Sequence, residues 1–299
     1  MNFKFTKYSA IYYIFSGILI LASIFFLVSF GLKFGIEFTG GSVIEASFEK
    51  RPSNEDIQKK LAGLNLGDII IQPTEQNGAI MQFREINEET HQQIISKLGE
   101  ISEIEEKNFQ FIGPSIGQEL KGKTEIAIVL ALLAITLYIA FAFRRVSKPV
   151  SSWKYGVASL IALFHDVFIP LGIFSILGEF YNVEITIPIV AALLTILGFS
   201  VHDTIVIFDR IRENILRRGG VSFREIVDLS LNQTIGRSLS TVFTVLIVLF
   251  SLFIFGGSTL KYFSLALIIG ITCGAYSSIF IASPLLVTWL DWSHRRVAK

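Results

Sequence analysis

Six long apolar runs constrain this chain more than any other feature of its sequence. A helix that crosses the roughly 30 Å hydrocarbon layer of a membrane needs about 20 predominantly apolar residues. Six segments meet that requirement, and they lie at residues 10–32, 126–143, 155–177, 185–208, 238–260 and 262–290. The sequence therefore predicts a polytopic α-helical membrane protein with six transmembrane helices.

The positions of Lys and Arg around these runs predict the orientation of the chain. Short loops on the cytoplasmic side of a membrane carry an excess of both residue types. Here they gather at both ends and in two connecting loops, at Lys4, Lys7, Arg144, Arg145, Lys148, Arg210, Arg212, Arg217, Arg218, Arg224, Arg295, Arg296 and Lys299. Residues 178–184 include neither type, and the last turn has only Lys261. We therefore expect both termini on the cytoplasmic side.

The long segment at residues 33–122 then lies outside the cytoplasm. Its pattern predicts a strand, a helix, two strands, a helix and a strand, at residues 42–48, 54–63, 68–72, 79–84, 87–98 and 107–112, with a turn at Gln76-Asn77-Gly78. This β-α-β-β-α-β order is the ferredoxin-like pattern. We expect an α+β extracytoplasmic domain that packs without a disulfide, because Cys273 is the one cysteine of the chain.

These assignments divide the chain into four parts. The N-terminus and first transmembrane helix take residues 1–32, and the extracytoplasmic domain takes residues 33–122. A five-helix bundle at residues 123–290 includes a cytoplasmic loop at residues 209–235, and residues 291–299 form a cytoplasmic tail.

Ionisable residues inside the apolar runs are the candidates for function, because they are costly in a membrane. His165-Asp166 lies in the third run and His202-Asp203 in the fourth, while Arg237 precedes the fifth. Asp203 and Arg237 enter from the same side, so we expect them at similar depth. A carboxylate that gains and loses an Arg partner changes its proton affinity, as an ion-coupled switch requires. The alternative is a static buried pair that fixes helix register.

Small and hydroxyl-bearing residues mark two of the runs for helix packing. In the sixth run they recur every four residues, at Gly270, Gly274, Ser278 and Ala282. Such a stripe lets another helix approach closely, and we expect that helix to belong to a partner subunit. In the fifth run we expect hydrogen bonds across helices from Ser240, Thr241 and Thr244.

Seven motifs follow one another along the chain, at residues 35–41, 113–117, 163–166, 198–210, 212–214, 232–237 and 276–279. In this order and topology they resemble the SecF family of protein-export membrane proteins, the partners of SecD. Both are similar to the resistance-nodulation-division transporters. The motif after the first run carries Gly35, Phe38, Thr39, Gly40 and Gly41. Two departures are Glu37, where the family usually has Asp, and His202, where it has Asn.

The resemblance implies an ion-gradient-coupled accessory subunit of the Sec translocase in the bacterial inner membrane, acting with SecD on preprotein translocation. It implies the SecYEG channel as a further partner, with YajC and YidC as candidates, and proton or sodium as the coupling ion. It assigns an ion relay to Asp203, Arg237, His202, His165 and Asp166. It predicts no enzyme activity, cofactor or metal, and no nucleic-acid partner.

Three other interpretations stay open. A small-molecule exporter of the resistance-nodulation-division type would need two large outer domains, and this chain offers one. A membrane enzyme would need a catalytic group, but Ser200 and His202 are two residues apart on one helix and point in different directions. The two His-Asp pairs offer metal ligands. A passive scaffold would use Asp203 for structure alone.

Overall fold

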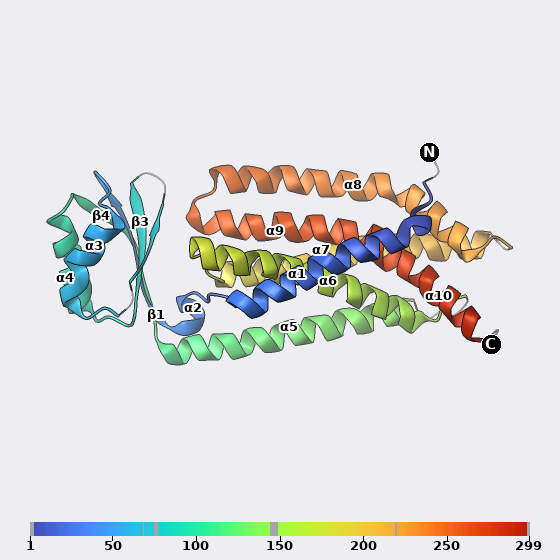
Figure 1. Cartoon of the computed structure of the whole chain (residues 1–299), viewed down its shortest axis with the longest axis horizontal. Helices are drawn as coiled ribbons and strands as arrows, with labels where there is room; N and C mark the ends of the chain where they lie inside the picture. The colour runs from blue at the N-terminus through green and yellow to red at the C-terminus, as the bar shows by residue number, and fades with distance from the viewer. Residues whose placement is uncertain (1–2, 68, 75–76, 144–148, 219, 298–299) are drawn as a thin grey trace. The chain divides into compact units, whose positions relative to one another are not determined.

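The computed structural model of the chain describes residues 3–67, 69–74, 77–143, 149–218 and 220–297 (Figure 1). The chain forms two compact units. The helical unit consists of Met1–Leu32, Ala127–Glu179 and Pro188–Lys299, and the α/β unit of Lys33–Ile126 and Phe180–Ile187. Some of our sequence predictions fall outside the described residues, namely those on Asp68, Gln76, Arg144, Arg145, Lys148 and Lys299, as do the side chains of Arg295 and Arg296.

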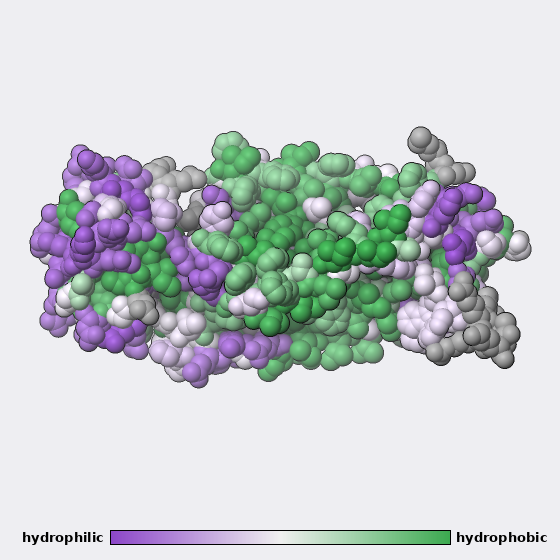
Figure 2. Space-filling view, viewed as in Figure 1, coloured by the Kyte–Doolittle hydropathy of each residue, from purple (hydrophilic) through white to green (hydrophobic). Residues whose placement is uncertain are grey.

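Within the described residues, six helices are long and apolar enough to cross a membrane, which confirms the predicted number. They are Phe5–Phe30, Pro114–Ala142, Ser152–Tyr181, Ile187–Arg217, Phe223–Phe255 and Leu260–Ser293. The corresponding elements are η1 (Phe5–Tyr8), α1 (Ser9–Phe30), α5 (Pro114–Ala142), α6 (Ser152–Tyr181), α7 (Ile187–Arg217), α8 (Phe223–Phe255), α9 (Ser258–Ser277), a π-helical segment η3 (Ser278–Ala282) and α10 (Ser283–Val297). Hydrophobic side chains cover most of the visible face of this unit (Figure 2).

The helices extend beyond the apolar runs that predicted them. α7 continues to Arg217, and α8 begins at Phe223, so most of the predicted loop at residues 209–235 is helical. The start of α8 has a local cause, because the Ser222 hydroxyl accepts a hydrogen bond from the Glu225 amide (3.3 Å). A capped first turn of this kind needs no apolar residues, which is why hydropathy alone places the boundary too late.

The α/β unit contains the predicted strands and helices in the predicted order. They are β1 (Gly41–Phe48), α3 (Asn54–Leu61) with η2 (Ala62–Leu64), β2 (Ile70–Pro73), β3 (Gly78–Phe83), α4 (Glu88–Gly99) and β4 (Ile104–Ile112), preceded by α2 (Ile36–Thr39). The strands form one antiparallel sheet in the order β2-β3-β1-β4. The side chains of Ser53 and Asn87 cap α3 and α4, accepting from Asp56 N (3.2 Å) and Thr90 N (2.9 Å).

Alternate residues of the strands build the core of the α/β unit together with one face of each helix. Since side chains of a strand point to opposite faces in turn, β1 buries Ile44, Ala46 and Phe48 on one side. Apolar residues of α3 and α4 fill the same cluster, including Ile57, Leu61, Ile94 and Leu98. The unit therefore has a packed apolar core of its own.

The loop between α6 and α7 also belongs to the α/β unit. The Gly35 amide donates to the carbonyl of Ile185 (3.0 Å), and the Ile185 amide donates to the carbonyl of Lys33 (2.7 Å). These bonds form a parallel bridge between Phe34 and Ile185. The predicted limits of 33–122 leave this loop out, because a pattern along the sequence cannot reveal pairing between segments so far apart.

Candidate ion-relay site

Asp166 is the centre of a fully buried polar cluster that joins three helices. Its carboxylate, 0% exposed, accepts hydrogen bonds from the hydroxyls of Ser200 on α7 (2.5 Å) and Ser277 on α9 (2.8 Å). Nδ1 of His165 lies 3.0 Å from the other carboxylate oxygen. Because a buried carboxylate is stable only when it is hydrogen-bonded, this residue fixes α6, α7 and α9 against one another.

Two consecutive serines at the start of a π-helical segment contact different helices. Ser277 donates to Asp166 of α6, whereas the hydroxyl of Ser278 lies 2.7 Å from that of Thr204 on α7. Ser278 also donates to the carbonyl of Ser200 (3.4 Å). The π-helical segment η3 begins at Ser278, and single π turns inside helices are frequent at functional sites.

Asp203 lies in a second polar cluster, between α7 and α8. One carboxylate oxygen accepts a hydrogen bond from the hydroxyl of Ser238, while the other is buried and has no hydrogen-bond partner among the described residues. A cavity of about 20 Å³ adjoins it, lined by Phe199, His202, Asp203, Val206, Arg237, Ser238, Thr241 and Val242. That volume is enough for about one water molecule.

The structure brings Arg237 to this cavity but does not pair it with Asp203. The ion pairs among the described residues do not include these two side chains, and Ser238 takes the place that we expected for Arg237. His202 lines the same cavity. A neutral donor next to the carboxylate leaves Asp203 without a neutralising partner in direct contact.

The two clusters lie on neighbouring turns of α7. Ser200, which contacts Asp166, and Asp203 are three residues apart, and residues at that spacing lie next to each other on a helix face. All five predicted relay residues thus fall in two adjoining groups. His165 and Asp166 form the first, and Asp203, His202 and Arg237 surround the second.

The hydroxyl residues that hold the carboxylates are not among the residues that the sequence predicts for the relay. They are Ser238, which follows Arg237, and Ser200 and Ser277, which contact Asp166. The detectable signal is that Ser200 and Thr204, one turn apart, interrupt an apolar run. Hydroxyls inside a membrane helix need partners, so such a pair indicates a polar contact on that face.

Within the chain, the small-residue stripe of the sixth helix contacts α7, and the hydroxyls of the fifth helix bond to their own helix. A Cβ on Gly270 would overlap Ile196, and a Cβ on Gly274 would lie 3.0 Å from Cβ of Ser200. The small-residue stripe therefore accommodates α7 of the same chain. The hydroxyls of the fifth helix are exposed and bond to carbonyls of their own helix at 2.8–3.0 Å, in Ser240, Thr241 and Thr244.

The motif after the first helix packs against the motif that opens α5. A Cβ on Gly40 would lie 2.7 Å from Cα of Pro114, and one on Gly117 would lie 2.9 Å from the Gly40 amide nitrogen. Gly40 (φ 77°) and Gly41 (φ 138°) also adopt backbone angles that favour glycine. Backbone therefore contacts backbone here, which no other residue allows.

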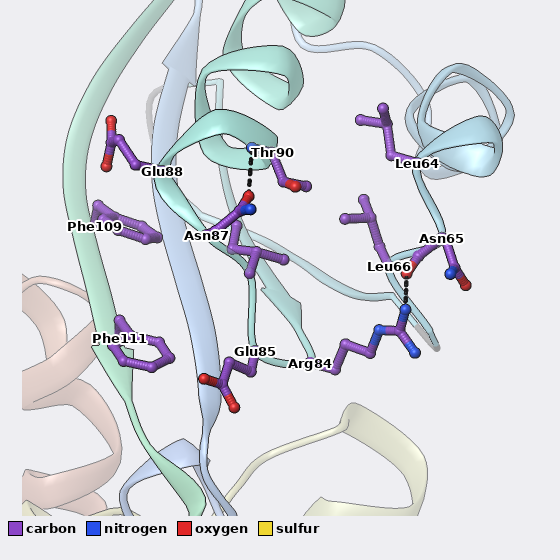
Figure 3. Close-up of a pocket in the computed structure, with 11 residues that line it drawn as sticks. Leu64, Asn65, Leu66, Arg84, Glu85, Asn87, Glu88, Thr90, Phe109 and Phe111 are labelled. Atoms are coloured by element: carbon purple, nitrogen blue, oxygen red, sulfur yellow. Dashed lines mark hydrogen bonds between the residues drawn. The ribbon is translucent and has the colours of Figure 1, made fainter.

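The α/β unit has a larger cavity of its own, of about 720 Å³ (Figure 3). Its walls combine apolar and polar side chains, from Leu64, Asn65, Leu66, Arg84, Glu85, Ile86, Asn87, Glu88, Thr90, Phe109 and Phe111. Phe111, one of the lining residues, has an exposed fraction of 48%. Across the described residues, no group of three or more His, Cys, Asp or Glu side chains is placed to hold a metal ion.

A bundle of apolar helices with buried carboxylates, and an α/β unit after the first of them, define a multi-pass membrane protein with a polar centre. Residues 92–292 match the family described as "Protein export membrane protein SecD/SecF, C-terminal", and residues 25–50 match the "SecD/SecF GG Motif". The chain belongs to the SecD/SecF family of protein export membrane proteins.

Similar proteins agree with this assignment. The chain is 45% identical to the protein translocase subunit SecF of Thermobaculum terrenum, over 96% of this chain and 94% of that protein. It is 38% identical to SecF of Vibrio alginolyticus, over 94% and 88%. The crystal structure of SecDF from Thermus thermophilus, titled a translocon-associated membrane protein, matches with a TM-score of 0.87 at 31% identity. That match covers 97% of this chain but 39% of SecDF.

Proposed function

We propose that this chain is the SecF-type accessory subunit of the Sec translocase and that it couples an ion gradient to preprotein translocation across the bacterial inner membrane. The relatives named SecF support the first part of the proposal. The second part depends on one observation, the buried carboxylate oxygen of Asp203 that no described residue satisfies. An ionisable group in this state inside an apolar helix is the simplest carrier of a gradient.

The chemistry of coupling follows from the surroundings of Asp203. Ser238 can donate a hydrogen bond to the carboxylate, and its oxygen can accept a hydrogen bond from the O–H of the neutral acid, so the contact persists in both states. Arg237 lines the same cavity, and its attraction to Asp203 disappears when the carboxyl is protonated. Moving one charge across 100 mV corresponds to about 2.3 kcal/mol, enough to shift a balanced contact between α7 and α8. The coupling ion is proton or sodium.

His165 and Asp166 form the proposed second station. Asp166 connects through Ser200 to the turn of α7 that precedes Asp203. Nε2 of His165 is buried and has no hydrogen-bond partner within the described part of the chain. A proton that leaves Asp203 therefore has a basic nitrogen and a carboxylate nearby, whereas a passive scaffold needs neither.

An exposed polar surface on α8 supports a membrane partner. Arg237, Ser240, Thr241 and Thr244 occupy one face of this helix and are exposed in the chain by itself, as is His202 on α7. Because an Arg and a row of hydroxyls are costly when they face lipid, another protein should cover this face. We propose SecD, since this chain accounts for 39% of the length of SecDF. SecYEG, YajC and YidC are further proposed partners.

The cavity of the α/β unit supports a contact with the translocating chain. Phe109 and Phe111 offer apolar surface beside hydrogen-bonding groups such as Asn65 and Asn87. Concave sites that bind flexible ligands combine apolar walls with a few polar groups. With both termini in the cytoplasm, this cavity would face an emerging preprotein on the other side of the membrane.

The decisive test is Asp203→Asn, which preserves shape and removes titration. Membrane vesicles that contain the full assembly should lose gradient-stimulated export completely, while ATP-driven export persists. Asp209→Asn is the matched control, because Asp209 is exposed near the end of α7 and lies 3.9 Å from Arg212. The control should respond like wild type. If Asp203→Asn vesicles also respond to the gradient, Asp203 is structural and the scaffold interpretation holds.

A further inference from the structure

The loop between α6 and α7 is fastened to the sheet of the α/β unit by side chains as well as by backbone. Gln82 of β3 donates to the carboxylate of Glu184 (2.6 Å), and Gln72 of β2 donates to the carbonyl of Asn182 (2.6 Å). Lys33 donates to the side chain of Asn182 (3.0 Å). Two strands of the sheet therefore hold a loop that leads directly into α7.

A second carboxylate lies close to Glu184 in this fastening. A Cβ on Gly35 would stand 2.5 Å from Oε2 of Glu37 and 3.4 Å from Oε2 of Glu184, so both oxygens converge on this glycine. Both side chains are half-buried. Two like charges this close in a partly buried position repel, unless one of them takes up a proton.

Burial, with the charge of Glu37 adding to it, raises the pKa of Glu184 to about 7, although the hydrogen bond from Gln82 and the charge of Lys33 oppose the shift. Burial also raises the pKa of Glu37, against hydrogen bonds from backbone amides that include that of Ile187. The neighbouring Phe34 carries a further cation, because Nζ of Lys121 on α5 lies 5.5 Å from the centroid of its ring.

We propose that Glu184 fastens the loop between α6 and α7 to the sheet in a pH-dependent way, holding it when the carboxyl is neutral and releasing it when Glu184 and Glu37 are both ionised. Neutral Glu184 keeps its carbonyl oxygen as an acceptor for Gln82 and no longer repels Glu37. When both are charged, the half-buried pair gains by moving into water, and the backbone bonds of Ile185 open with the loop.

The device connects the α/β unit to a helix of the proposed ion relay. α7 begins at Ile187 and carries Asp203, so the loop that is released continues directly into that helix. The pH that counts is that on the side of the membrane where the α/β unit lies. The inference goes beyond the proposed function and does not depend on it, because its readout is local.

The sign and size of the effect follow from linkage. The fastened form raises the pKa of Glu184 from 4.5 to about 7, so it gains protons and stability as the pH falls below 7. The released form has the ordinary value. Between pH 8.5 and pH 6 the ratio of fastened to released loop should therefore rise roughly tenfold.

The test measures hydrogen exchange at the amides of Gly35 and Ile185, which form the backbone bridge. It uses the full chain in lipid nanodiscs, with rates corrected for their intrinsic pH dependence. In wild type the protection factor should rise about tenfold from pH 8.5 to pH 6. In Glu184→Gln the protection factor should not change with pH, since the amide side chain cannot ionise. Glu37→Gln should keep the rise but shift it to lower pH.

Glu89→Gln, a change of an exposed carboxyl on α4, is the matched control and should behave like wild type. Protection at the Ile44 amide of β1 reports whether each variant is folded. A flat profile in wild type, or a wild-type profile in Glu184→Gln, overturns the proposal. If Glu184→Gln fails the Ile44 check, the wild-type profile together with the shift in Glu37→Gln decides it.

Discussion

The two units of this protein differ in the polar side chains that accompany their buried apolar clusters. In the α/β unit the buried cluster is apolar, with residues such as Ile44, Met81 and Leu98 at 0% exposure. In the helical unit the centre contains carboxylates, an imidazole and hydroxyls, at Asp166, Asp203, His165, Ser200, Thr204, Ser238, Ser277 and Ser278. The helical unit also buries an apolar cluster, and it exposes further large apolar residues on its outer helices, for example Leu133, Leu137 and Phe141 on α5.

The difference reflects the solvent that each unit meets. In water the burial of apolar surface is favourable, so the α/β unit buries it. In hydrocarbon that driving force is absent and polar groups cannot be solvated, so a membrane helix bundle buries its polar groups, where they form hydrogen bonds with one another. Polar groups in the centre of the helical unit are therefore ordinary for a membrane protein, just as apolar groups are ordinary in the core of the α/β unit. What points to function is the oxygen of Asp203 that remains unpaired.

The largest predicted effect compares a leucine that is buried in the α/β unit with a leucine that is exposed on the helical unit. Leu98→Ala removes a fully buried side chain of α4 and should lower the stability of the α/β unit by about 2–5 kcal/mol. Leu133→Ala removes a side chain that is 55% exposed on α5 and should change stability by less than about 0.5 kcal/mol. Denaturant dependence of hydrogen exchange in the full chain measures both. An equally large loss for Leu133→Ala would show that protein, not lipid, covers that face.

The next effect tests whether the buried polar centre holds the helical unit together. Asp166→Leu leaves the hydroxyls of Ser200 and Ser277 without their acceptor and should cost about 3 kcal/mol. Asp166→Asn keeps an acceptor oxygen for both and should cost about 1 kcal/mol. Thermal unfolding in detergent compares the two variants. Equal losses would mean that the charge of Asp166, and not its hydrogen bonds, stabilises the centre.

Local signals in the sequence were enough to predict most of the fold. Hydropathy identified the six helices, and the helices expected to begin at residues 54 and 87 are capped by Ser53 and Asn87. Alternation in residues 42–48 identified β1, which buries Ile44, Ala46 and Phe48 on one face. These features depend on neighbours within a few residues, which is the range that a sequence pattern covers.

The contacts of the site depend on three-dimensional neighbours and were harder to predict. The sequence suggested Arg237 as the partner of Asp203, but Ser238, one residue later, faces the carboxylate. One residue on a helix turns the side chain by about 100°, a difference that the depth of a residue in the membrane does not reveal. The stripe at Gly270 and Gly274 likewise shows that a helix approaches, but not which one.

A smaller effect concerns close packing inside the helical unit. Gly270→Ala places a methyl group against Ile196 and should cost about 1–3 kcal/mol, because a tightly packed contact must open. Gly198→Ala is the matched change, since a Cβ there meets no heavy atom within 4 Å. It should be neutral or stabilise the helix by up to about 1 kcal/mol. Thermal unfolding of the full chain distinguishes them, and a loss in Gly198→Ala would reveal a partner on α7.

The smallest predicted effect compares helix caps in the two units. Asn87 caps α4, a helix of 12 residues, and Ser222 caps α8, a helix of 33 residues. Each substitution by Ala removes one hydrogen bond to a first-turn amide, worth about 1 kcal/mol. In Asn87→Ala that loss should appear in global unfolding of the α/β unit, because α4 supplies Ile94 and Leu98 to its core.

In Ser222→Ala the same loss should appear only as faster hydrogen exchange in the first turn of α8, since fraying of that turn leaves the apolar part of the helix in place. Protection around Thr241 should not change. A global loss of stability in Ser222→Ala would contradict this, and would mean that the start of α8 supports the whole bundle. The contacts that could give it that role are those of Asp228, whose carboxylate accepts from the amide and the hydroxyl of Thr6 (both 2.8 Å).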